Sequence, residues 1–138
     1  YLNGVAMADA SAIVPFQSCG SCRRAWTSWD AFVRDPAVRL LGLQALTSKP
    51  EFNLLVFEHR CGSSISILVR RLRHLLPEPE PPRPLPLMFG SEHCHGHCRH
   101  LSDLEACDNP CAHARDRQLI LLILRIKRES EAASSVRP

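Results

Sequence analysis

The pattern of apolar and polar positions in the first half of the chain predicts three strands. Val38 to Leu46 is the first, Asn53 to Glu58 is the second, and Ser64 to Leu68 is the third. His59 to Ser63 joins the last two segments. We therefore expect a β-hairpin whose tip carries His59 and Cys61.

Two stretches around these strands have helical spacing. A short helix is expected after Thr27 or Ser28, either of which can cap it, and Asp35-Pro36 ends it. Its apolar residues are Trp29, Phe32 and Val33. Leu68 to Leu76 predicts one amphipathic helix that closes the first domain.

The last part of the chain predicts helices as well. Ser102 to Glu105 matches a capping box, so a helical turn is expected through Cys107. Asn109-Pro110 favours the start of a longer helix, with Cys111 in its first turn. Its apolar stripe is Leu119, Leu122, Ile123 and Ile126. A strand over Leu119–Ile126 is the competing interpretation, and a broad apolar helix here would be buried on two sides or docked on a partner.

A proline-rich stretch divides the chain. Six prolines fall between Pro77 and Pro86, and such a run favours extended polyproline conformation. The expected organisation is a zinc-ribbon-like domain over 1–76, a linker over 77–87, and a Cys/His-rich segment with the amphipathic helix over 88–138. The fold class is α+β, a small antiparallel sheet with short helices. Halves this small usually need metal, disulfides or a partner for stability.

The cysteine count favours reduced thiols. Seven cysteines leave one over in a closed disulfide framework, and Tyr1 to Phe16 lacks the features of a secretory signal. Met7 is a possible natural start, which would make the first six residues an addition. We expect a cytoplasmic protein whose cysteines bind metal.

The first candidate metal site combines a knuckle with the hairpin tip. Cys19-Gly-Ser-Cys22 lets both sulfurs face one ion, and Gly20 is expected to ease the tight turn. His59 and Cys61 are two residues apart, so on an extended strand end they project to the same side. The prediction is a closed tetrahedral zinc site with three sulfurs and one nitrogen. Ordinary buried or redox thiols are the alternative.

A second candidate site lies in a dense Cys/His cluster. Its ligands are Cys94, Cys98, Cys107 and Cys111, with His113 as an exchangeable or fifth ligand. Two zinc ions per chain are the default expectation, with an iron–sulfur cluster on these four cysteines as the alternative. A helical hairpin stapled by disulfides is a third interpretation. Other histidines of the cluster are expected to be exposed or to hydrogen-bond the sulfurs: His93, His95, His97 and His100.

The net charge and the absence of known catalytic motifs limit the classes of function that the sequence supports. A formal net charge of +3 does not indicate nucleic-acid binding, and no apolar run approaches the ~20 residues of a membrane span. Neither His-Glu-x-x-His nor a glycine-rich phosphate loop occurs, which disfavours an enzyme. The expected function is a zinc-stabilised structural or regulatory interaction module. It is expected to bind a protein partner, or a second copy of itself, through Leu119–Ile126. An iron–sulfur redox, electron-transfer or sensor protein is the alternative.

The chain resembles a group of small uncharacterised bacterial proteins. The shared features are Cys19-Gly-Ser-Cys22 followed by Trp and Asp-Pro, then Phe57-Glu-His-Arg-Cys61-Gly, then paired Cys-x-x-x-Cys motifs before an aliphatic helix. They cover most of residues 16–128. His113 stands where the pattern leads us to expect a further cysteine. The resemblance implies two metal knuckles joined by a variable linker, and it implies no activity.

Overall fold

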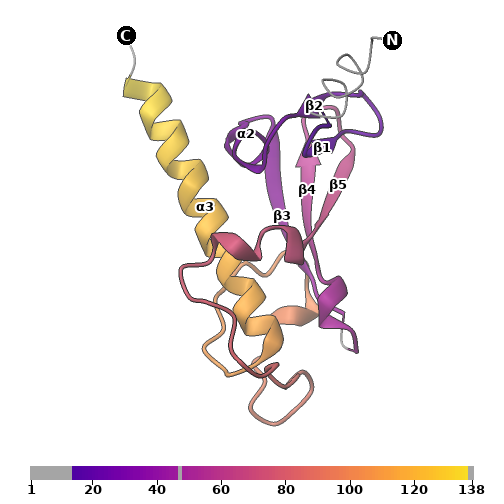
Figure 1. Ribbon diagram of the computed structural model, residues 1–138, viewed down its shortest axis with the longest axis vertical. Helices are drawn as coiled ribbons and strands as arrows, with labels where there is room; N and C mark the ends of the chain where they lie inside the picture. The colour runs from indigo at the N-terminus through magenta and orange to yellow at the C-terminus, as the bar shows by residue number, and fades with distance from the viewer. Residues whose placement is uncertain (1–13, 47, 137–138) are drawn as a thin grey trace, which may run out of the picture.

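The chain folds into two small antiparallel sheets and a long C-terminal helix (Figure 1). The computed structural model describes residues 14–46 and 48–136, so the possible start at Met7 lies outside it. The first sheet pairs β1 (Gln17–Ser18) with β2 (Ala25–Trp26), and the second has the order β3 (Val38–Gln44), β4 (Leu54–His59), β5 (Ser64–Leu68). This architecture confirms the predicted α+β class.

The helices begin close to where their capping residues indicate. In α2 (Trp29–Arg34) the Ser28 side chain accepts a hydrogen bond from the Ala31 N–H, as a capping serine should.

The C-terminal helix is α3 (Ala112–Val136), so the competing strand over Leu119–Ile126 is wrong. Cys111 lies one residue before this helix instead of inside its first turn. Two short 3₁₀ helices, η1 (Pro50–Phe52) and η4 (His97–Arg99), occur in loops.

The amphipathic helix expected over Leu68 to Leu76 is wrong. Two 3₁₀ turns occupy this stretch, η2 (Val69–Arg71) and η3 (Arg73–Leu75), and Leu72 lies between them at φ −119° and ψ −3°. Pro77 follows the stretch directly and disfavours the helical conformation at Leu76, which is extended at ψ 136°. The 3₁₀ turns still bury Val69, Leu72 and Leu76 against the core.

The helical turn expected from Ser102 through Cys107 is also absent from the described chain. The Asp103 side chain accepts a hydrogen bond from the Glu105 N–H, which is a local turn that competes with helix. The carbonyls of Asp103 and Glu105 accept hydrogen bonds from the buried Arg117 guanidinium. A side chain from α3 thus takes the acceptors that a helix would have used.

Helix α3 and the sheet share one hydrophobic core. Leu119, Ile120 and Ile123 are fully buried, and Ile126 is nearly so. They join one cluster with Phe32 and the inward residues of β3 and β4. Most of the segment predicted as a docking surface therefore packs inside the protein. Leu121 remains 44% exposed on the opposite side of α3, whose C-terminal part extends beyond the sheet (Figure 1).

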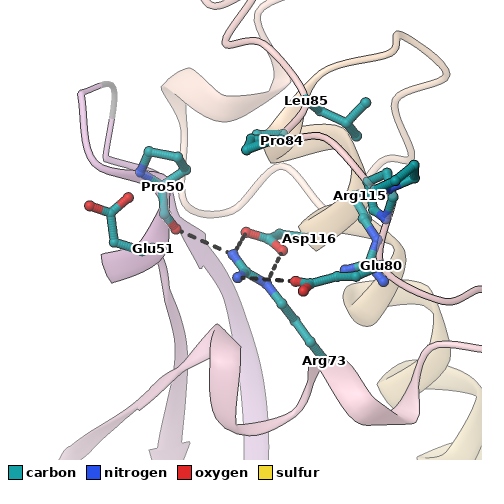
Figure 2. Close-up of a pocket in the computed structure, with 11 residues that line it drawn as sticks. Pro50, Glu51, Arg73, Glu80, Pro84, Leu85, Arg115 and Asp116 are labelled. Atoms are coloured by element: carbon teal, nitrogen blue, oxygen red, sulfur yellow. Dashed lines mark hydrogen bonds and ion pairs between the residues drawn. The ribbon is translucent and has the colours of Figure 1, made fainter.

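A buried ion pair ties the start of α3 to the sheet region. Figure 2 shows Arg73 pointing at Asp116, with Nε–Oδ1 and Nη2–Oδ2 distances of 2.9 and 3.0 Å. Asp116 is 1% exposed and also accepts a hydrogen bond from Asn53 Nδ2 at 2.9 Å. Glu80 approaches Arg73 from the proline-rich segment at 3.9 Å. Arg73, Glu80 and Asp116 border a pocket of about 370 Å³ that the proline-rich segment helps to line.

Gly42 is the point where the Cys-rich segment touches β3. The register of β3 against β4 shifts between Leu40 and Gly42, so the strand bulges here. A Cβ atom at Gly42 would lie 1.6 Å from the Leu101 carbonyl oxygen. Only glycine permits this approach, and Leu101 lies between Cys98 and Cys107 in the sequence.

Candidate metal centre

Two hairpins meet at one end of the molecule and bring four ligand atoms together. Cys19 and Cys22 come from the β1–β2 turn, His59 is the last residue of β4, and Cys61 lies in the β4–β5 turn. Their sulfur and imidazole nitrogen atoms all lie within 4.8 Å of one another. These are the four residues predicted for the first site, and together they can hold a metal ion.

Backbone hydrogen bonds shape the Cys19–Cys22 knuckle. The Cys19 N–H donates to the Arg24 carbonyl at 2.7 Å, and the Arg23 N–H donates to the Cys19 carbonyl at 3.0 Å. Arg23 takes the left-handed conformation at φ 67°. Gly20 does not adopt a positive φ, and a Cβ placed on it would meet nothing within 4 Å. The expected role of Gly20 is therefore wrong: Arg23 makes the tight turn.

The hairpin tip presents the other two ligands. The Gly62 N–H donates to the His59 carbonyl at 2.8 Å, and Gly62 has φ 94°, which closes the turn. The His59 ring packs edge-on against Trp26, with ring centroids 5.2 Å apart. Trp26 is held in turn by its indole N–H, which donates to Asp35 Oδ2 at 2.8 Å. Packing against the buried Trp26 thus fixes the orientation of the His59 ring.

The ligand separations fit a tetrahedral ion. Zinc–sulfur bonds of ~2.3 Å and zinc–nitrogen bonds of ~2.0–2.1 Å at tetrahedral angles place sulfurs about 3.8 Å apart, and sulfur and nitrogen about 3.5 Å apart. The Cys19 and Cys61 sulfurs are 3.5 Å apart. His59 Nδ1 lies 3.5 Å from the Cys22 sulfur and 3.2 Å from the Cys61 sulfur. Small adjustments would seat one ion at the centre.

The surroundings favour thiolates at two of the cysteines. The N–H of Cys22, the Ser63 hydroxyl and the N–H of Ser21 lower the pKa of Cys19 to about 5. The hydroxyl and N–H of Ser63 also lower the pKa of Cys61. Because the thiolate is the form that binds metal, both sulfurs are prepared for an ion.

The pKa values of Cys22 and His59 are raised instead. The Arg24 N–H favours the Cys22 thiolate, but desolvation and the neighbouring sulfurs of Cys19 and Cys61 outweigh it and raise the Cys22 pKa. The hydrogen bond to Cys61 raises the pKa of His59. A bound cation would reverse both preferences, since it favours the thiolate and the neutral imidazole.

Ser63 is a site residue that the sequence analysis missed. Its hydroxyl oxygen lies 3.0 Å from the Cys19 sulfur and 3.2 Å from the Cys61 sulfur, so it bridges the two hairpins. Its position two residues after Cys61, at the end of the predicted turn, is the signal that would have indicated it.

The second cluster is arranged around a small cavity. Cys94, Cys98, Cys107 and Cys111 all line a space of about 20 Å³, together with His97 and His113. Over residues 14–46 and 48–136, the Cys19/Cys22/His59/Cys61 set alone has three or more ligand atoms within 4.8 Å of one another. The second metal site therefore stays a prediction. All seven cysteines are free, so the disulfide alternative is wrong.

The histidines of the second cluster have different environments. His93, His95 and His100 are exposed, whereas His97 Nδ1 lies 2.9 Å from Asp103 Oδ2. His113 is 1% exposed and its Nδ1 lies 2.9 Å from Asn53 Nδ2. The interpretation of His113 as an exchangeable or fifth ligand stays a prediction.

Comparisons with known proteins found no relative of this chain. No protein-family model, no curated protein and no solved structure matches this chain. Within the described residues, no helix carries a long enough apolar stretch to cross a bilayer. What the chain shows by itself is an α+β fold with a Cys₃His group that can hold a metal ion.

Proposed function

We propose that this protein is a zinc-stabilised interaction module in which the metal has a structural role. The observation that carries the proposal is the convergence of Cys19, Cys22, His59 and Cys61 from two separate hairpins. Three sulfurs and one nitrogen complete a tetrahedron, so no coordination position is left for a substrate. Sulfur-rich tetrahedral sites of this kind suit zinc.

The size of the metal contribution supports a structural role. The β1–β2 sheet pairs only two residues per strand, and an isolated hairpin of this length is marginal in water. Structural zinc contributes an apparent ~10–16 kcal/mol of binding free energy in zinc-finger peptides. A whole domain has a net stability of ~5–15 kcal/mol. One ion therefore suffices to hold the knuckle on the hairpin tip.

The partner-binding part of the proposal rests on α3. Leu121 is exposed, and with Leu122, Leu124 and Leu76 it borders a hollow flanked by Arg125 and Arg128. We assign this face to self-association and test it by sedimentation velocity of the full chain. Concentration-dependent dimers that the Leu121→Glu variant abolishes would support the assignment, and a monomer at all concentrations would refute it.

The metal part is tested by removing the ion. In the full chain, a strong zinc chelator should release the Cys19–Cys22 knuckle and change the near-ultraviolet circular dichroism signal of Trp26, which packs on His59, and added zinc should restore it. The Cys61→Ser variant should behave like the metal-free protein. Ser64→Ala, an exposed change three residues away, is the matched control and should keep the wild-type response. A wild-type spectrum that does not respond to chelation would refute the structural role.

A further inference from the structure

The cavity lined by the four C-terminal cysteines has the size of a single ion. A cavity needs a volume of about 10–15 Å³ to hold one water molecule, and this cavity has a volume of about 20 Å³. Its four sulfurs come from a turn, a 3₁₀ helix, a loop and the residue before α3. A single ion fits this space if the sulfurs move inward, since no three of them lie within 4.8 Å of one another, whereas a cluster of several irons and sulfides needs more than the present volume.

Hydrogen-bond donors point at the sulfurs of this cavity. The Met88 N–H donates to the Cys111 sulfur at 3.3 Å. Neutral thiols are poor acceptors, whereas thiolates bound to metal accept such bonds readily. The donor pattern is the one that metal-bound thiolates require.

A buried cation faces the same sulfurs. Arg117 is 0% exposed, and its Nη1 donates to the Cys98 sulfur at 3.9 Å. The same guanidinium donates to the Glu105 carbonyl at 2.7 Å and to Asp103 Oδ1 at 3.2 Å. A buried charge is costly unless it is paired, and four thiolates around one zinc carry a net negative charge. Arg117 would offset part of it.

The proton on His113 is placed by its neighbours. Asn53 Oδ1 accepts a hydrogen bond from the Leu46 N–H at 2.8 Å, which fixes the orientation of the amide. Asn53 Nδ2 is therefore the donor to both Asp116 Oδ2 and His113 Nδ1, each at 2.9 Å. Because Nδ1 accepts, the neutral imidazole carries its proton on Nε2.

That Nε2–H is the unusual feature. It is buried, it has no hydrogen-bond partner in the described part of the chain, and its ring lines the cysteine cavity. Buried donors are nearly always paired, so an unpaired one beside a cavity indicates a missing acceptor. A thiolate drawn into place by an ion would supply that acceptor.

We propose that Cys94, Cys98, Cys107 and Cys111 bind one zinc ion as four thiolates, and that His113 donates its Nε2–H to one of these sulfurs as a positioning residue instead of binding the metal. Zinc binding releases the four thiol protons to solvent. This site is separate from the Cys19/Cys22/His59/Cys61 site of the proposed function. The two lie at opposite ends of β4, roughly 20 Å apart along the strand.

Metal counting on paired variants separates the two sites. The wild-type chain should hold two zinc ions, and Cys94→Ser/Cys98→Ser and Cys19→Ser/Cys22→Ser should each hold one. If wild type holds one ion that only the Cys19/Cys22 variant loses, the second site is refuted and the proposed function stands. If only the Cys94/Cys98 variant loses it, the proposed function fails instead. Iron with acid-labile sulfide that the Cys94/Cys98 variant loses would refute zinc here.

Zinc X-ray absorption on the wild-type chain avoids variants that fail to fold. Four thiolates at one site and Cys₃His at the other give an average of three and a half sulfurs and half a nitrogen per zinc. If His113 replaced one thiolate, the average would be three sulfurs and one nitrogen, which would refute its role as a donor. An average of three sulfurs with a single zinc per chain would refute the second site.

His113→Leu tests the hydrogen bond itself. Loss of such an outer partner typically weakens metal affinity ~10–100-fold. In chelator competition, the variant should still bind two zinc ions. A chelator with ~10–100-fold lower zinc affinity than the wild-type chain requires should remove one of them. His100→Leu, an exposed change in the same cluster, is the matched control and should match wild type. Equal affinity in His113→Leu and wild type would refute the positioning role.

Discussion

Substitution of Gly42 by alanine tests how the Cys-rich segment is held on the sheet. The added Cβ would lie 1.6 Å from the Leu101 carbonyl oxygen and 2.7 Å from its carbonyl carbon. Ordinary contacts of this kind are ~3.5 Å, so the Leu101 backbone must move by about 2 Å. Gly42 also has φ 154°, which alanine rarely adopts. The change cannot be absorbed by rotation of a flexible side chain, because the obstacle is backbone.

The expected cost follows from these two effects. Overpacking costs ~1–3 kcal/mol, and an unfavourable backbone conformation adds ~1–3 kcal/mol. We therefore expect Gly42→Ala to lower the free energy of unfolding by about 2–6 kcal/mol. With a denaturant dependence of ~2 kcal/mol/M in urea, the midpoint should fall by about 1–3 M.

The assay is urea unfolding of the full chain at a fixed excess of zinc, followed by circular dichroism. Gly20→Ala is the matched control, since nothing lies within 4 Å of its added Cβ and its φ is ordinary. The control should stay within about 0.5 kcal/mol of wild type. If Gly42→Ala is equally neutral, the contact between β3 and Leu101 does not hold the segment, and the reasoning is refuted.

Three further changes test the core, the ion pair and the acid response. Phe32→Ala should cost ~3–5 kcal/mol in urea unfolding, because Phe32 is fully buried and packs edge-on against Trp26 and Phe57; a loss under 1 kcal/mol would contradict this. Asp116→Asn should cost ~1.5–3 kcal/mol, because the partly exposed Arg73 loses its charged partner but keeps other hydrogen-bond acceptors, and an unchanged midpoint would refute the ion pair's role. Desolvation raises the pKa of Asp35, but hydrogen bonds from the Trp26 indole and the Ala37 N–H outweigh it and lower the pKa below the usual 3.8. The resulting stability is present above pH ~4 and is lost as the pH falls through the folded-state pKa, so Asp35→Asn should flatten the urea midpoint against pH in this range; an identical acid slope would contradict it.

The sequence predicted the first ligand set because local rules determine it. A Cys-x-x-Cys knuckle and a five-residue hairpin tip fix their own geometry, so Cys19, Cys22, His59 and Cys61 needed only the two hairpins to meet. The strands and α2 followed from alternation and from the Ser28 cap. These features depend on neighbours within about ten residues.

What the sequence did not predict depends on distant contacts. The turn at Ser102 to Cys107 is not helical because Arg117, more than ten residues later, takes its carbonyl groups. The sequence left open whether the stripe on α3 is buried or docked on a partner, and its packing against Phe32 and β3 decides for burial. The approach of Leu101 to Gly42 and the tie between Asn53 and His113 have the same origin. Such residues are recognised only once the chain is folded.

Elemental analysis of the full chain, purified without oxygen and paired with an absorbance spectrum, tests the central claim most directly. We expect a colourless protein with two zinc ions per chain, at least one of which depends on Cys19, Cys22, His59 and Cys61. A folded protein free of metal would contradict it, and so would a brown protein that carries iron and acid-labile sulfide.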